Sequence, residues 1–142
     1  MHDSLSREMA GRMQLVQCGD RCVTSFDPDT GQPLWAVDGP SEEFVATPFY
    51  CPQAGLVFIS SSWPQRHLLA IKPDGQGNVT QTHVAWRDNQ GAPYIPSFMV
   101  VDAVIFVSPP TDARGGTLRT CAHARTDPGQ PASRSHPVLD TR

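Results

Sequence analysis

The stretch that decides the fold reads Ser25-Phe26-Asp27-Pro28-Asp29-Thr30-Gly31-Gln32-Pro33-Leu34-Trp35. Its middle, residues 27–31, predicts a tight turn. Pro28 presets φ, the Asp27 side chain can accept hydrogen bonds from backbone amides, and Gly31 can take the left-handed conformation. The flanking segments, 21–26 and 33–37, contain the β-branched and aromatic residues typical of strands. The sequence therefore predicts two antiparallel strands joined by this turn.

A second copy of the pattern lies further along the chain. It reads Ala70-Ile71-Lys72-Pro73-Asp74-Gly75-Gln76-Gly77. The tryptophan that ends it is Trp86, which lies 51 residues after Trp35. The starts of the following strands also repeat, as Ala-Thr-Pro-Phe at 46–49 and Ile-Pro-Ser-Phe at 95–98. A repeat of about fifty residues is typical of solenoids, propellers and arrays.

The composition favours many short strands. The 142 residues include 14 Pro and 11 Gly, which forbid long helices and suit frequent turns. The segments predicted as strands are 14–18, 21–26, 33–37, 45–51, 56–61, 67–71, 81–86 and two within 98–107. We therefore expect an all-β chain that forms an incomplete β-propeller of four-stranded antiparallel blades, followed by a disordered C-terminal tail.

Two turns and the N-terminus carry further predictions. Gly19 and Asp20 suit a two-residue hairpin turn, which would place Cys18 opposite Arg21. A second tight turn is expected at residues 102–103, inside the last apolar run. Residues 1–13 are predicted to be a short helix or a frayed lead-in, with Ser6 as its N-cap.

The first copy resembles the pyrroloquinoline-quinone (PQQ)-type repeat of β-propellers. That repeat reads Ala, any residue, Asp, two of any, Thr-Gly, three of any, Trp. The residues at those positions here are Ser25, Asp27, Thr30, Gly31 and Trp35, and only Ser25 departs from the pattern.

The second copy is a degenerate form of the same repeat. Ala70 and Trp86 are kept, Lys72 replaces the Asp, and a wider turn contains Gly75. In the third copy, residues 120–126 resemble the repeat, but no Trp follows. The resemblance covers roughly residues 14–108.

The resemblance implies a domain organisation. It consists of a lead-in at 1–13, propeller blades at 14–110 and a disordered tail at 127–142, with a partial blade at 14–39, a full blade at 44–88 and a degenerate blade at 93–126. A closed propeller needs four to eight blades, so we expect the chain to be a fragment or one partner in an assembly. Each tryptophan is expected to pack between blades, with Ser25 or Ala70 leaving room beneath it.

The resemblance also bears on function. Enzymes with this repeat are quinoprotein dehydrogenases, which hold PQQ and calcium, but none of their site residues can be placed on this sequence. We therefore expect a non-catalytic interaction scaffold without a cofactor, bound to a protein partner or to the remaining blades of a longer propeller. One alternative is a fragment of a PQQ-dependent dehydrogenase, with PQQ and calcium. Another is a carbohydrate-binding propeller, with Trp63 and Tyr94 as its exposed aromatics.

Other chemistry lacks a motif in the sequence. Zinc sites pair closely spaced cysteines, and only Cys18 and Cys22 are close, so the cysteines are expected to be small thiols packed in strands. The histidines share no ligand spacing, and neither a nucleophile elbow nor a phosphate loop occurs. Asp27 and Asp29 lack the third acid that a calcium site would need.

Charge and hydropathy limit the partners and the location. The net charge of −3 argues against nucleic acid as a partner. No apolar run approaches the roughly 20 residues of a membrane span. The N-terminus has no apolar stretch of signal-peptide length. We expect a cytoplasmic location if the chain is complete, and a periplasmic or secreted one if a longer protein supplies a signal.

Overall fold

A computed structural model describes residues 4–39, 47–61 and 67–88, together with the backbone of three further strands. The described part is all-β and contains no helix, which confirms the predicted fold class at this level. The strands are β1 (Ser4–Met9), β2 (Arg12–Cys18), β3 (Cys22–Phe26), β4 (Pro33–Asp38), β5 (Phe49–Cys51), β6 (Leu56–Ser61), β7 (His67–Ile71), β8 (Gly77–Asn78), β9 (Val84–Asp88), β10 (Phe98–Val101), β11 (Val104–Val107) and β12 (Thr117–Thr120). The described residues therefore include no candidate for a membrane-spanning helix.

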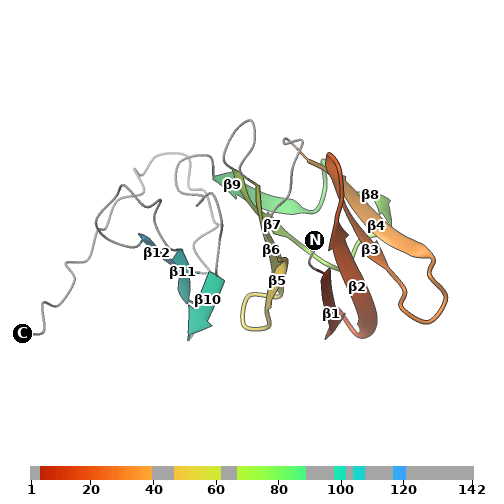
Figure 1. The fold of residues 1–142 in the computed structure, drawn as a ribbon, viewed down its shortest axis with the longest axis horizontal. Coiled ribbons are helices and arrows are strands. Elements are labelled where there is room, and N and C mark those ends of the chain that lie inside the picture. The colour runs from red at the N-terminus through yellow and green to blue at the C-terminus, as the bar shows by residue number, and fades with distance from the viewer. Residues whose placement is uncertain are drawn as a thin grey trace, which may run out of the picture.

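The strands form three sheets. The first sheet has the order β1-β2-β3-β4-β8, the second β5-β6-β7-β9 and the third β10-β11-β12. Strands that follow one another in these orders pair antiparallel, except that β8 pairs parallel with β4. Figure 1 shows the sheets side by side, with the second sheet in the middle. The described sheets do not close into a ring.

The N-terminal prediction is wrong. Residues predicted as a helix or lead-in form β1, which pairs along its whole length with β2 from Ser4↔Gln17 to Met9↔Arg12. Ala10 and Gly11 have φ of 51° and 75°, as the tight turns of hairpins require. Leu5 and Met9 lie on the core side of β1, at the even spacing that a strand requires. The strands β1 to β4 of the first sheet therefore form a four-stranded meander rather than the partial unit expected at 14–39.

The first predicted turn is shifted by one residue. Cys18 pairs with Val23 rather than with Arg21, and Gly19 N–H donates to the Cys22 carbonyl at 2.8 Å. The two turn residues are therefore Asp20 and Arg21, and Arg21 has the positive φ, 57°. Residues directly opposite each other share a face of the sheet, so the predicted register would have turned Arg21 into the core beside buried Cys18.

The remaining predicted strands are largely confirmed, with two late starts. The strand predicted at 45–51 begins at Phe49, since the described residues Thr47 and Pro48 precede it. The strand predicted at 81–86 begins at Val84 because Thr82 and His83 donate their backbone amides to the Val79 carbonyl and so form a turn. The hairpin predicted around residues 102–103 is supported by the pairing of Val101 with Val104. The turn residues themselves, residues 45–46 of an earlier strand and the predicted tail at 127–142 lie outside the described residues.

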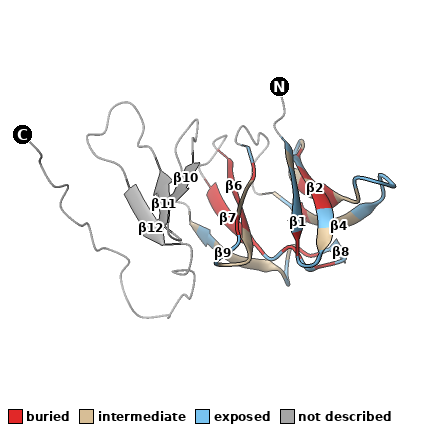
Figure 2. Cartoon of the chain, turned by 90° about the horizontal axis from the view of Figure 1, so that it is seen from below, coloured by how far each residue is buried: buried red, intermediate tan, exposed pale blue. Residues whose placement is uncertain are grey.

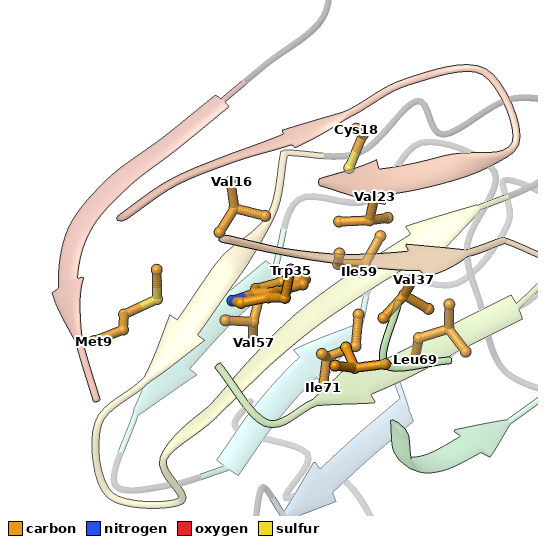
Figure 3. Packing of buried hydrophobic residues seen from close by; sticks show 11 residues of the cluster. Met9, Val16, Cys18, Val23, Trp35, Val37, Val57, Ile59, Leu69 and Ile71 are labelled. Carbon is orange, nitrogen blue, oxygen red and sulfur yellow. The ribbon is translucent and has the colours of Figure 1, made fainter. Parts of the chain in front are cut away.

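The core lies between the first and second sheets. Val16, Val23 and Trp35 from the first sheet meet Val57 and Ile71 from the second in one buried cluster (Figure 3). A separate buried cluster around Phe58 lies on the opposite face of the second sheet. Side chains on both faces of β6 and β7 are therefore buried along almost the whole of each strand (Figure 2), which accounts for the apolar runs at 56–59 and 68–71.

Candidate functional site: the tryptophan motifs

Trp35 lies between the two sheets. It is 1% exposed, and its ring lies beside Val57 of the second sheet (Figure 3). Its cross-strand partner is Ser25, which is small and fully buried. The register then shifts between Ser25 and Phe26, so that Phe26 pairs with Pro33. The first motif thus places a large indole beside a small residue next to a β-bulge, a feature that sharpens local twist.

Gln14 joins the motif to its surroundings. Its Oε1 accepts hydrogen bonds from Ser25 Oγ and Trp35 Nε1, both at 2.8 Å. Its Nε2 donates to the carbonyl oxygens of Met9 and Pro73, both at 2.9 Å. This fully buried amide therefore uses both of its lone pairs and both of its protons. From β2, it connects β1, β3 and β4 of the first sheet to the segment that follows β7.

The polar motif residues stabilise the turn at residues 27–31. Asp27 Oδ1 accepts the backbone amides of Asp29 at 2.8 Å and Thr30 at 3.2 Å. Thr30 Oγ1 accepts a hydrogen bond from the backbone amide of Gln32 at 3.3 Å. Gly31 has φ of 72° and donates its amide to the Asp27 carbonyl at 2.8 Å. The carboxylate therefore caps the turn, as the sequence indicates.

The second motif repeats this geometry with different polar chemistry. Trp86 pairs with Ala70, and the register again shifts at the next residue, so that Ile71 pairs with Val84. The rings of Trp86 and Phe58 lie 5.8 Å apart at 54°. The pairings place Leu56 where the first sheet has Gln14. Trp86 Nε1 is buried and has no hydrogen-bond partner among the described residues, in contrast to Trp35.

A crossing loop, residues 72–83, connects the two sheets. Within it, β8 pairs with β4 as Trp35↔Gly77 and Ala36↔Asn78, and Val79 enters the shared core. Val79 N–H donates to the Ala36 carbonyl at 2.8 Å. Since the loop leaves the second sheet after β7, pairs with the first sheet at β8 and returns to the second sheet at β9, it holds the two sheets together.

Side chains of the first sheet and of the loop itself hold the loop in place. Arg12 donates to the Gly75 carbonyl at 2.7 Å, and Asn78 donates to Asp38 Oδ2 at 2.8 Å. Asp38 N–H in turn donates to Thr80 Oγ1 at 2.9 Å. Gly75, predicted from the sequence as a motif residue, therefore lies at the contact between the two sheets.

Sequence reasoning missed Gln14 and this loop. A polar residue at an inward position of a strand was the available signal for Gln14, because such a group needs partners once it is buried. For the loop, the signal was the widened turn after Lys72, which leaves enough chain to reach the neighbouring sheet.

The cysteines and histidines do not gather into a metal centre within the described residues. Within the described residues, Cys18, Cys22 and Cys51 form no disulfide. Burial, together with the neighbouring Cys22 thiol, raises the pKa of Cys18 from 9.0 to about 12, so its thiol is protonated at neutral pH. His83 bonds Thr82 at 2.7 Å and lies 3.4 Å from Asp74, within the crossing loop. Other chemistry-bearing candidates lie outside the described residues: His2, Trp63, Tyr94, Cys121, His123 and His136.

Comparison with known proteins adds no relative. The chain matches no protein-family model and no curated protein.

The arrangement of the tryptophan motifs and the crossing loop provides packing and hydrogen bonding between the first and second sheets. Its polar groups are directed at one another and at the backbone.

Proposed function

We propose that the chain supplies blades of a PQQ-like β-propeller and acts as a non-catalytic scaffold for protein interactions. One observation carries the proposal. Two four-stranded meanders repeat the same tryptophan pairing and the same register shift, Ser25↔Trp35 in one and Ala70↔Trp86 in the other. Successive propeller blades are expected to share such a local design.

The contact between the sheets supports the blade interpretation. Trp35 is buried against the second sheet, as a wedge between neighbouring blades would be. Trp86 occupies the corresponding place on the face of the second sheet that lies away from the first. The same side chain therefore recurs on the same face of each sheet, as repeated head-to-tail stacking requires.

The chemistry of the motif supports a scaffold rather than an enzyme. The Asp27 carboxylate accepts hydrogen bonds from backbone amides of its turn. The Gln14 side-chain amide uses all of its donors and acceptors in hydrogen bonds inside the core. Groups used in this way stabilise a fold and are not free to act on a substrate. Fold resemblance alone does not imply the chemistry of related proteins.

A cofactor titration separates the scaffold from the dehydrogenase fragment. The full chain is titrated with PQQ at saturating calcium, and again with calcium chelated, while tryptophan fluorescence is recorded. We expect no saturable, calcium-dependent quenching. Stoichiometric, calcium-dependent uptake of PQQ would favour the dehydrogenase reading and overturn the scaffold.

The blade architecture has a separate test. Nuclear Overhauser contacts between the Trp35 ring and the Val57 methyl groups are expected if the two sheets stack as described. Their absence in the folded chain would contradict the stacked arrangement, whatever the result with PQQ.

A further inference from the structure

The outer edge of β4 is occupied by a parallel strand. β8 lies along it in the register Trp35↔Gly77 and Ala36↔Asn78. Ala36 accepts the Val79 amide at 2.8 Å, so the backbone of Ala36 faces outward from the sheet. A glycine lies opposite the tryptophan, and Asn78 lies opposite Ala36. The pairing of β8 with β4 therefore serves as a template for how the edge of such a sheet binds an added strand.

The outer edge of β9 corresponds to that of β4. Both strands are the fourth of a meander and share the tryptophan pairing and register shift. This correspondence places Arg87 where the first sheet has Ala36. Among the described residues, no strand pairs with the far side of β9. The backbone N–H and C=O of Arg87 are thus the groups that an added strand would use.

The side chain at this position indicates the chemistry of the added strand. Arg87 carries an exposed, positively charged side chain, whereas the side chain of Ala36 is small and uncharged. In the template, the residue opposite Ala36 is Asn78, an amide. A carboxylate at the same place in the added strand would be the better complement for a guanidinium, because charge-assisted hydrogen bonds are shorter and stronger.

We propose that the edge of β9 binds an extended protein segment as a parallel strand, with glycine opposite Trp86 and an acidic residue opposite Arg87. The proposal deepens the scaffold function, on which it rests, by naming the class of partner. Main-chain hydrogen bonds to an exposed edge supply affinity in this mode of recognition, and side chains supply specificity.

The test uses the full chain labelled with ¹⁵N. The probe is a synthetic peptide that copies residues 75–81 with the change Asn78→Glu. We expect the Arg87 amide to show the largest shift, with the Ala36 amide unmoved and a dissociation constant on the order of 1 mM. A second peptide, N-methylated at the position of Val79, lacks the donor for the Arg87 carbonyl and should bind at least tenfold more weakly.

Two variants of β9 provide the matched comparison. Arg87→Pro and Arg87→Ala both remove the guanidinium, but only proline removes the backbone donor, and proline is tolerated on edge strands. Binding should be lost in Arg87→Pro and only weakened in Arg87→Ala. Equal binding of the N-methylated peptide, a shift at Ala36 instead of Arg87, or no shift at either residue would overturn the proposal. Because the peptide comparison needs no variant, it stands even if Arg87→Pro does not fold. None of these outcomes bears on the PQQ titration or on the Trp35–Val57 contact.

Discussion

The indole Nε1 of Trp35 donates a 2.8 Å hydrogen bond to Oε1 of Gln14, 21 positions earlier in the chain. Both side chains are buried, and the same oxygen accepts a second bond from Ser25. The indole therefore has a fixed polar anchor as well as apolar packing. The second sheet, with Leu56 and Ala70 at the corresponding places, retains the packing without the anchor.

Replacing Gln14 by leucine should destabilise the protein strongly. The change Gln14→Leu leaves the buried donors of Ser25 and Trp35 without an acceptor, and we expect a loss of at least about 2 kcal/mol in the free energy of unfolding. Urea denaturation measures it. The control is Gln17→Leu on the same strand, an exposed position where the change should stay within about 0.5 kcal/mol. Similar losses in both variants would contradict the role of Gln14.

Truncating Trp35 tests how completely the ring is buried. Trp35→Ala removes an indole that is 1% exposed, so we expect a loss of roughly 3–5 kcal/mol in stability. Chemical denaturation followed by circular dichroism gives the value. A loss below about 1 kcal/mol would mean that the ring faces solvent.

The two tryptophans should respond differently to phenylalanine. Trp35→Phe removes a hydrogen-bond donor from Gln14, whereas Trp86→Phe removes an indole N–H that has no partner in the part of the chain that the structure describes. We expect Trp35→Phe to cost at least about 1 kcal/mol more than Trp86→Phe. Thermal and urea unfolding of the two variants measure the difference. Equal costs would indicate that the hydrogen bond adds nothing to ring packing.

A methyl group at Gly75 should disturb the crossing loop. An added Cβ would lie 2.7 Å from Val79 Cγ1 and 3.1 Å from the His83 ring, so Gly75→Ala should cost about 1–3 kcal/mol through overpacking. Amide hydrogen exchange at Val79 should become faster. The matched change Gly19→Ala brings Cβ no closer than 3.7 Å to its neighbours and should be nearly neutral. An unaltered Gly75→Ala variant would contradict the close packing of the loop.

Alkaline pH should destabilise the fold through Cys18. The pKa of its thiol is raised from 9.0 to about 12 in the folded chain, so the folded state resists losing this proton. The associated stabilisation is complete below pH 9 and is lost as the pH rises toward 12. Urea midpoints from pH 8 to 11 should therefore fall more steeply for the natural chain than for Cys18→Ala. Parallel curves would show that burial of Cys18 is not linked to its ionisation.

Local patterns predicted those strands whose signals lie close together in the sequence. Asp27, Pro28 and Gly31 specify their turn without help from distant residues, and the apolar runs of β6 and β7 identify strands covered on both faces. β1 was missed because Ser4, Ser6 and Glu8 make its outer side polar, and only Leu5 and Met9 mark the inner side. Pairing with β2 along its whole length stabilises β1 as a strand.

The parts of the site that depend on distant contacts were beyond local patterns. Nothing near Gln14 reveals that Ser25, Trp35 and Pro73 converge on it, because these partners lie 11, 21 and 59 residues away. The turn between β2 and β3 is a second case, because Gly19 indicates a turn at residues 19–20, whereas Arg21 has the positive φ and Gly19 N–H donates to the Cys22 carbonyl.

The parallel pairing of β8 with β4 bears on the order in which the chain can mature during synthesis. Four strands of the first sheet leave the ribosome by residue 38, but the fifth arrives only with Gly77 and Asn78. Until then, the backbone edge at Ala36 and the space filled by Val79 stand open to other contacts. The first sheet therefore reaches its final form only after most of the second sheet has been synthesised, which couples the folding of the two sheets in time as well as in space.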